Sequence, residues 1–464
     1  MLAFSGFAMV ALFMTLIMTK RLSPLAALVL IPVATALLLG HSPDDIGVMA
    51  LAGIKALAPT GVMLMFAILF FGVMIDAGLF DPVVSRIVRL VEGDPLKVVV
   101  GTAVLAAVIS LDGDGATTYM ITVAAMLPLY QRLGMNALNL TCVTMLASGV
   151  MNLTPWGGPL ARAASALHVD PSDIFIPMLP PMAVALVGVF LIAWHLGLKE
   201  RKRLSFVVDA GGKAPVQALP PLPHGSSGNH TATGIVADEL MEETALLPDP
   251  ATARASARPR LLPVNIALTA ILMGALIMQA LPMPVLFIIG FTVALLINYP
   301  HMADQRERLV AHAPNAVAVV SIIFAAGIFT GILNGTGMVA AMSASFVQAV
   351  PDALGPALAP ITAVASLPFT FFISNDAFYF GVLPVVAEAG GGFGIAPIEM
   401  ARASLVGQPV HILSPLVPST FLLVGLAGVE LGDHQRFTFK WAILICLLIG
   451  GMAMLTGAFG FGTM

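Results

Sequence analysis

Residues 110–120 read SLDGDGATTYM, so two carboxylates, Asp112 and Asp114, alternate with glycines inside a long apolar stretch. Glycines allow the chain to turn sharply at such a point. The apolar residues on either side then form two short helical legs. This pattern predicts a re-entrant hairpin over about residues 97–130.

The composition places this hairpin in a membrane protein. Of the 464 residues, 58% are hydrophobic and 10% are charged, too few charges to cover a soluble protein of this size. Apolar runs of about 17–20 residues recur, the length that a helix needs to cross a hydrocarbon core. We therefore expect an all-α polytopic membrane protein in a lipid bilayer. The net charge of −4 gives no indication of nucleic-acid binding, and no CxxC spacing indicates a redox centre or a permanently bound cofactor.

Hydropathy predicts ten crossings and two hairpins. Regions 97–158 and 356–425 each contain a hairpin followed by one crossing that is broken by a polar, Pro-containing segment. A polar break at membrane depth is tolerated only where protein buries it or where it lines a wet cavity. The other eight predicted spans lie near residues 2–19, 24–40, 60–79, 176–196, 262–280, 284–299, 316–334 and 438–459.

The order of these features predicts two inverted repeats, each of five crossings plus one re-entrant hairpin with a broken helix. We expect a first repeat at 1–198, a flexible cytoplasmic linker at 199–261 and a second repeat at 262–464 with a hairpin at about 356–390. Positions 70, 72 and 78 recur as the same residue types 259 positions later. Basic residues gather in the predicted inner loops, which places both termini outside.

Three further polar breaks complete the candidate site. Residues 373–381 read ISNDAFYFG, residues 152–159 read NLTPWGGP, and residues 407–420 read GQPVHILSPLVPST. Broken helices of this kind hold the substrate in many secondary transporters. Arg162 and Arg402 are expected at the outer ends of the two broken helices, where they either steer anions inward or extend to the membrane interface.

The residues leave alternatives open at each point. Asp114 either caps a short helix or binds a cation or proton, and two intramembrane acids favour the second role. His411 is either a structural histidine or a proton-coupling group. An intramembrane aspartyl protease would need a Gly-x-Gly-Asp order, which the Asp-Gly-Asp-Gly run lacks. A cation/proton antiporter is the other transporter class that fits, and a simple cation would stabilise it.

The stretches LDGDGATTYMITVAAMLPLY, MNLTPWGGP, SNDAFYFGVLP and VGQPVHILSPLVPST together resemble the bacterial citrate–divalent-metal/proton symporter family (CitMHS) of the ion transporter superfamily. The resemblance covers both halves and omits only the linker. It implies a symporter, not an enzyme, that imports citrate with Mg²⁺ or Ca²⁺ and protons across the bacterial cytoplasmic (inner) membrane. It also implies a homodimer and an elevator motion. Another di- or tricarboxylate transporter of the superfamily is the alternative.

The matching motifs also imply roles for single residues. Asp112, Asp114, Asp376 and His411 become candidates for proton coupling, and Asp114 and Asp376 for contact with the metal of a metal–citrate complex. The implied substrate-binding residues are Asp114, Gly115, Thr117, Thr118, Asn152, Thr154, Pro155, Ser374, Asn375, Asp376, Ser414 and Pro415.

Overall fold

The computed structural model describes residues 2–19, 21–91, 93–113, 115–209, 256–349 and 351–462, and all regular elements in these ranges are helices. The all-α prediction is therefore confirmed. The elements of the first half are α1 (Leu2–Met18), α2 (Pro24–Leu38), α3 (Pro43–Asp76), α4 (Asp81–Val91), α5 (Pro95–Ile109), η1 (Ser110–Asp112), α6 (Gly115–Arg132), α7 (Ala137–Met151), α8 (Gly158–Leu167) and α9 (Pro171–Asp209).

The second half begins with a short 3₁₀ turn and continues in a similar order. Its elements are η2 (Pro259–Leu261), α12 (Leu262–Ile277), α13 (Met283–Asn298), α14 (Met302–Gly335), α15 (Met338–Ala349), η3 (Asp352–Ala357), α16 (Leu358–Phe372), the π-helical turn η4 (Ala377–Val382), α17 (Leu383–Gly391), α18 (Pro397–Ser404), α19 (Gln408–His411), α20 (Pro418–Ala427) and α21 (Leu431–Leu455).

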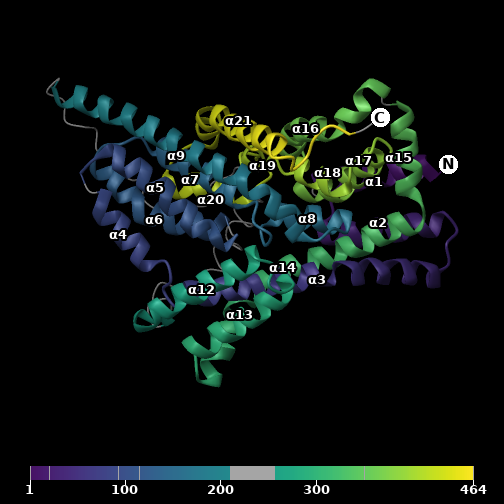
Figure 1. Cartoon of the computed structure of the whole chain (residues 1–464), viewed down its shortest axis with the longest axis horizontal. Helices are drawn as coiled ribbons and strands as arrows, with labels where there is room; N and C mark the ends of the chain where they lie inside the picture. Colours follow the sequence, from purple (N-terminus) through teal and green to yellow (C-terminus); the bar gives the residue numbers. More distant parts are fainter. Residues whose placement is uncertain are drawn as a thin grey trace, which may run out of the picture.

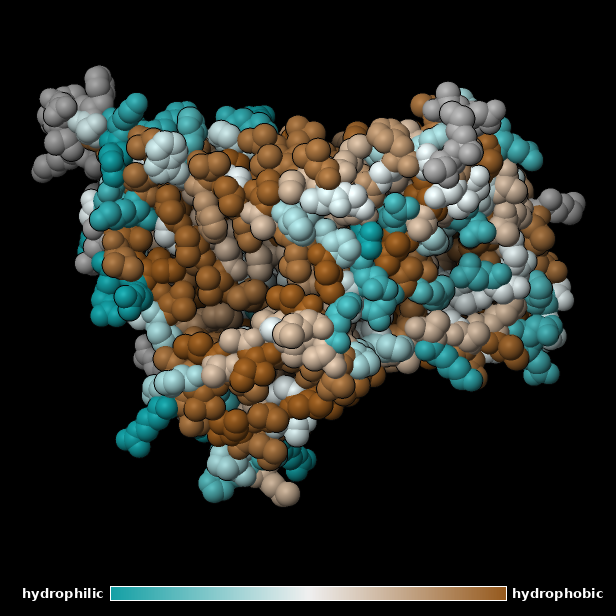
Figure 2. Space-filling view, viewed as in Figure 1, coloured by the Kyte–Doolittle hydropathy of each residue, from teal (hydrophilic) through white to brown (hydrophobic). Residues whose placement is uncertain are grey.

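Seven helices within the described residues are long and apolar enough to cross a membrane by length and composition. Figure 2 shows broad apolar areas on the face of the molecule, as expected for a surface in contact with lipid. Large apolar side chains such as Leu191 of α9, Ile271 of α12 and Leu447 of α21 are exposed. The total of ten crossings stays a prediction.

Two predicted spans are longer in the structure than hydropathy indicated. The span at 60–79 belongs to α3, which starts at Pro43 because Ser42 forms a capping box with Asp45 ahead of the first turn. The span at 316–334 belongs to α14, which starts at Met302. Charged residues near the start of each helix lower the local hydropathy, although the backbone continues as helix.

The predicted linker also differs from the structure at its start. The basic run that begins at Lys199 is part of helix α9, and this helix ends at Asp209. Within this extension Arg201 pairs with Asp94, and Arg203 donates to the carbonyl of Gly134. These contacts hold the end of α9 against the first hairpin. Residues 210–255 of the predicted linker lie outside the described residues.

The helices form two layers (Figure 1). We call α2, α3, α12, α13 and α14 the scaffold layer, because α3 packs along α14 and α13, and α2 packs along α14. Helices α5–α9 and α16–α21 form the hairpin layer, which lies above the scaffold layer in Figure 1. The polar breaks all belong to the hairpin layer or to its contact with the scaffold layer.

Helices α3 and α14 have 34 residues each and run antiparallel. The C-terminal Asp76 of α3 contacts Arg308 near the start of α14, whereas Gly53 meets Gly327 near the other end. The backbones touch at this crossing, since a Cβ on Gly53 would lie 1.9 Å from the carbonyl oxygen of Gly327. This antiparallel pair agrees with opposed halves, and the full inverted repeat stays a prediction.

Candidate functional site

The first hairpin consists of α5 and α6 with its tip at residues 110–114. Gly113 has a φ of 79°, in the left-handed region where a side chain is strained, so glycine permits the turn. The buried hydroxyls of Ser110 and Thr118 lie 3.1 Å apart and join the two legs. Asp112 is buried at this tip, and Thr117 is half-buried on α6. The predicted residue Asp114 lies outside the described residues.

Trp156 connects this tip to the first broken helix. It lies between α7 and α8, and its indole Nε1 donates to the carbonyl of Leu111 at 2.8 Å. Its ring packs against Phe71 of α3 and Phe287 of α13, with centroids 5.7 Å and 5.2 Å away. Sequence reasoning did not single out this residue. It joins the hairpin layer to two helices of the scaffold layer.

The second hairpin consists of α16, the π-helical turn and α17. Ser374 caps the start of its second leg, since its hydroxyl accepts a hydrogen bond from the backbone N–H of Ala377. The Oδ1 of Asn375 accepts from Nε2 of Gln408 at 3.3 Å, and the same nitrogen donates to the Tyr379 hydroxyl at 2.8 Å. These bonds tie the second tip to its own broken helix.

The second broken helix separates α19 from α20 at residues 412–417. Ser414 is buried and donates to the carbonyl of Phe371 at 2.6 Å, so it closes onto the first leg of the second hairpin. His411 bonds through Nδ1 to the carbonyl of Thr370 at 2.6 Å. This bond fixes the ring proton on Nδ1 and is typical of a structural histidine. Proton coupling by His411 stays a prediction, and Pro415 is exposed.

An ion pair joins the two halves at the centre of the site. Nε of Arg162 on α8 donates to Oδ1 of Asp376 in the second tip at 2.6 Å. The two side chains are 23% and 11% exposed, so the pair is not sealed from the surroundings. The sequence pointed to Asp376 but placed Arg162 at the outer end of its helix. The fold instead turns Arg162 toward the site.

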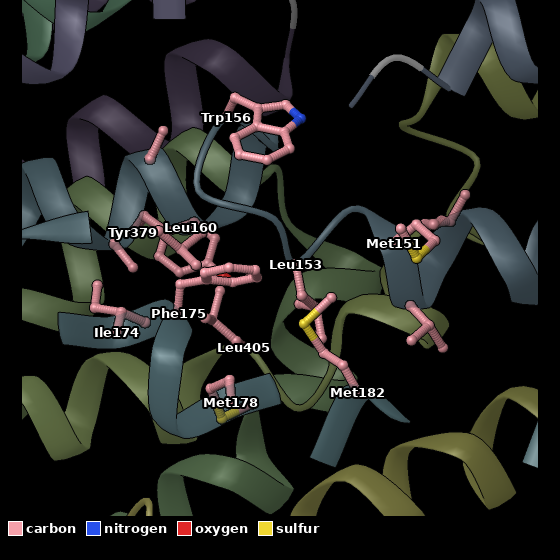
Figure 3. Close-up of a cluster of buried hydrophobic side chains, with 14 of the residues drawn as sticks. Met151, Leu153, Trp156, Leu160, Ile174, Phe175, Met178, Met182, Tyr379 and Leu405 are labelled. Carbon is pink, nitrogen blue, oxygen red and sulfur yellow. The ribbon is translucent and has the colours of Figure 1, made fainter. Parts of the chain in front are cut away.

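Apolar packing holds α8 in the position that this ion pair needs. Figure 3 shows Tyr379 from the second hairpin beside Leu160 of α8 and Phe175 of α9. All three side chains are buried. Since Leu160 lies two residues before Arg162, the same segment presents an apolar side chain to the second hairpin and a cation to its tip.

A similar contact occurs on the other side of the site. Helix α20 packs along α6, and a Cβ on Gly115 would lie 3.4 Å from the Ser419 hydroxyl. Each broken helix therefore lies against the hairpin of the other half. The predicted residues of the two halves are brought into one region of the hairpin layer by this arrangement.

The region contains polar atoms without a protein partner. In the part of the chain that the structure describes, neither Oγ1 of Thr154 nor Oε1 of Gln408 has a hydrogen-bond partner, although both residues are buried. Buried polar groups are ordinarily hydrogen-bonded. Asn152 is half-buried and Pro155 buried in the same break as Thr154. These acceptors and donors are available to a ligand or to water.

The other arginine of the breaks has a different role. Arg402 donates to the carbonyls of Ala458 and Asp173 at 2.8 Å and 2.6 Å, so it ties the C-terminal segment to the start of α9. Among the described residues there is no group of three or more His, Cys, Asp or Glu side chains that is able to hold a metal ion. The described site thus contains one arginine paired with one carboxylate, and the tip of the first hairpin carries a further buried acid, Asp112.

Comparison with known proteins identifies the family. The model of the citrate transporter family CitMHS matches residues 13–407. A citrate transporter of Bacillus subtilis is 53% identical over 99% of this chain and 100% of that protein. A Mg²⁺/citrate complex secondary transporter of the same organism is 47% identical, covering 99% of both chains. The solved YdaH transporter of Alcanivorax borkumensis is 14% identical with a TM-score of 0.48, covering 87% of this chain and 86% of that chain. The chain belongs to the CitMHS family of citrate transporters, and it is a multi-pass membrane transporter, not an enzyme.

Proposed function

We propose that this protein imports citrate as a complex with Mg²⁺ or Ca²⁺, together with protons. The observation that carries the proposal is the Arg162–Asp376 pair, because it offers a cation for a carboxylate and a carboxylate for a metal in one place. An acid beside the arginine would repel bare citrate, whereas it attracts the metal of a metal–citrate complex. The name of the relative that is 47% identical, a Mg²⁺/citrate complex secondary transporter, supports the same substrate class.

The charges of the substrate agree with such a site. Citrate is a trianion near pH 7, and one divalent metal leaves a complex of charge −1. Two or more protons carried with this complex make import electrogenic, so the membrane potential drives it with about 2.3 kcal/mol per charge per 100 mV. Asp112, Asp114, Asp376 and His411 are the proposed proton-coupling groups, in the bacterial cytoplasmic membrane.

The two-layer arrangement supports an alternating-access motion of the elevator type. The scaffold layer holds together through the backbone contact of α3 with α14, whereas the hairpin layer contains the site. Movement of the hairpin layer against the scaffold layer, within a homodimer that has all termini outside, would carry the substrate across. Trp156 packs on the scaffold layer through Phe71 and Phe287, so this aromatic contact has to change during the motion.

Uptake of labelled citrate into proteoliposomes tests the proposal. We expect uptake in the presence of Mg²⁺ or Ca²⁺ to rise when the outside is acidified, and to fall to background in a metal chelator. Empty liposomes serve as the control. If citrate uptake were greatest in the chelator, transport of a metal complex would be contradicted. If uptake were the same with and without an imposed pH gradient, proton coupling would be contradicted.

Thermal stability of the purified protein separates this function from cation/proton antiport. We expect citrate plus Mg²⁺ to raise the melting temperature more than either component alone, because a ligand stabilises the state that it binds. Stabilisation by the cation alone, with no effect of citrate, would instead identify an antiporter.

A further inference from the structure

We infer that Arg162 binds a carboxylate of the substrate, and that Asp376 holds this arginine in the empty carrier until substrate arrives. The inference rests on the proposed function and explains its metal requirement. A metal–citrate complex brings both an anion and a cation, so each member of the protein's ion pair exchanges its partner. Arg162 moves from Asp376 to a citrate carboxylate, and Asp376 moves from Arg162 to the metal.

The geometry of the pair suits an exchange. Among the described residues the contact is one hydrogen bond, from Nε of Arg162 to Oδ1 of Asp376. An arginine has five N–H donors and binds a carboxylate most strongly through two parallel bonds. The single bond therefore leaves the terminal nitrogens of the guanidinium for a second carboxylate. With 23% of the arginine side chain exposed, a ligand is able to reach them.

Gly158 lies directly against this guanidinium. A Cβ on Gly158 would lie 2.7 Å from Nη1 of Arg162, too close for any side chain at that position without a shift of the guanidinium. Gly158 also starts α8, the helix that carries the arginine. The absence of a side chain at this position lets Nη1 lie against the start of α8, four residues after Thr154, whose buried hydroxyl has no partner among the described residues.

The two residues that precede Asp376 provide no second cation. Both are neutral: Asn375 bonds to Gln408, and Ser374 caps the second leg of the hairpin. Citrate without metal would take Arg162 and leave the Asp376 carboxylate buried without a counter-charge, which is strongly unfavourable. Mg²⁺ and Ca²⁺ prefer carboxylate oxygens and repair this loss. The metal thus compensates the charge of Asp376 as well as that of citrate.

The test compares binding of citrate in a metal chelator with binding of citrate in excess Mg²⁺, measured calorimetrically on the purified full-length chain. For wild type we expect a clear preference for the metal complex. Asp376→Asn removes the charge that metal-free citrate would leave without a counter-charge, so the preference for the metal complex over metal-free citrate should fall at least tenfold. Arg162→Gln should weaken the binding of both metal-free citrate and the metal complex at least tenfold. Glu388→Gln, an exposed acid on α17 of the same hairpin, is the matched control and should leave the preference unchanged.

Several outcomes would overturn the exchange. One is an Asp376→Asn protein that keeps the wild-type preference for the metal complex, or whose affinity for citrate falls equally with and without metal. Another is an Arg162→Gln protein that binds both forms of citrate with wild-type affinity. If either variant does not fold, Arg162→Lys keeps the charge but removes the planar fork, and we expect weaker binding of the metal complex. Unchanged affinity in that variant would also refute the role of Arg162. Failure of wild type to bind citrate with or without any metal would refute the proposed function itself.

Discussion

Replacing Asp76 by asparagine should loosen the scaffold layer, because Asp76 joins its two long helices. Oδ2 of Asp76 accepts a hydrogen bond from Nη1 of Arg308 at 3.0 Å and bonds to Nε2 of His312 at 2.8 Å. The side chains of the ion pair are 2% and 8% exposed. Asp76 ends α3, whereas both partners lie in the first part of α14, so the substitution acts directly between the two halves.

The size of the effect follows from burial. Removing one member of a buried ion pair costs about 3–5 kcal/mol, since the other charge stays buried without compensation. Here Glu307 also contacts Arg308, but its side chain is 64% exposed and screened by solvent. The neutral asparagine is still able to accept one hydrogen bond. We therefore expect a loss near the lower end of the range, about 3 kcal/mol in the free energy of unfolding.

Reversible unfolding in mixed detergent micelles measures this loss. Asp81→Asn is the matched control, because Asp81 is exposed at the start of α4, and it should cost less than about 1 kcal/mol. The double variant Asp76→Asn/Arg308→Met removes both charges and should recover most of the stability. A single variant within about 0.5 kcal/mol of wild type, or a double variant that loses the sum of both single effects, would refute this reasoning.

Three further substitutions test other contacts. Gly53→Ala pushes a methyl group into the backbone of α14 and should sharply lower the melting temperature. Gly47→Ala on the same helix places its methyl group in open space and should leave the melting temperature unchanged. Equal melting temperatures of the two variants would contradict the close crossing. Trp156→Phe keeps the aromatic contact but loses one hydrogen bond, so it should cost about 0.5–1.5 kcal/mol in unfolding experiments, and a larger loss for Trp156→Ala is expected. Burial raises the pKa of Asp94, but the hydrogen bond and charge of Arg201, the backbone N–H of Leu96 and the charge of Lys97 together lower it more, so the net pKa lies below its ordinary value. The Asp94–Arg201 pair should contribute up to about 1 kcal/mol to the free energy of unfolding above pH 4, and this contribution should be lost as the pH falls through the lowered pKa. If an Asp94→Asn protein loses stability in acid as wild type does, the pair contributes nothing.

Hydropathy found the membrane helices but not their ends. It placed the apolar part of α3 at 60–79, whereas the helix starts at Pro43. The missing part contains acids and a lysine, so a hydropathy scale reads it as loop, although Ser42 and Asp45 form a recognisable capping box. The short amphipathic helix α4 was not predicted for the same reason. Backbone continuity depends on capping and packing, which average hydropathy does not measure.

The candidate site was predictable in its residue types and not in its pairings. Polar breaks such as the one around Asp376 stand out in an apolar chain, because polar groups at membrane depth are costly. The partner of Asp376 did not stand out, since Arg162 is 214 positions away and near a predicted helix end. Only the packing of α8 on the second hairpin brings the two together. Trp156 was missed because an aromatic residue in an apolar chain carries no distinct signal.

Among the described residues, two Asp–Arg pairs join the halves, one in each layer, and they differ in burial and in number of bonds. The Asp76–Arg308 pair is 2% and 8% exposed, and a histidine binds the same carboxylate oxygen, so breaking it leaves charges that solvent does not reach. The Arg162–Asp376 pair is 23% and 11% exposed and is made by one bond. The first arrangement keeps a fixed contact between the scaffold helices. The second is the pair that we propose to open when a ligand supplies both charges, so the same two residue types would support the scaffold in one layer and recognise substrate in the other.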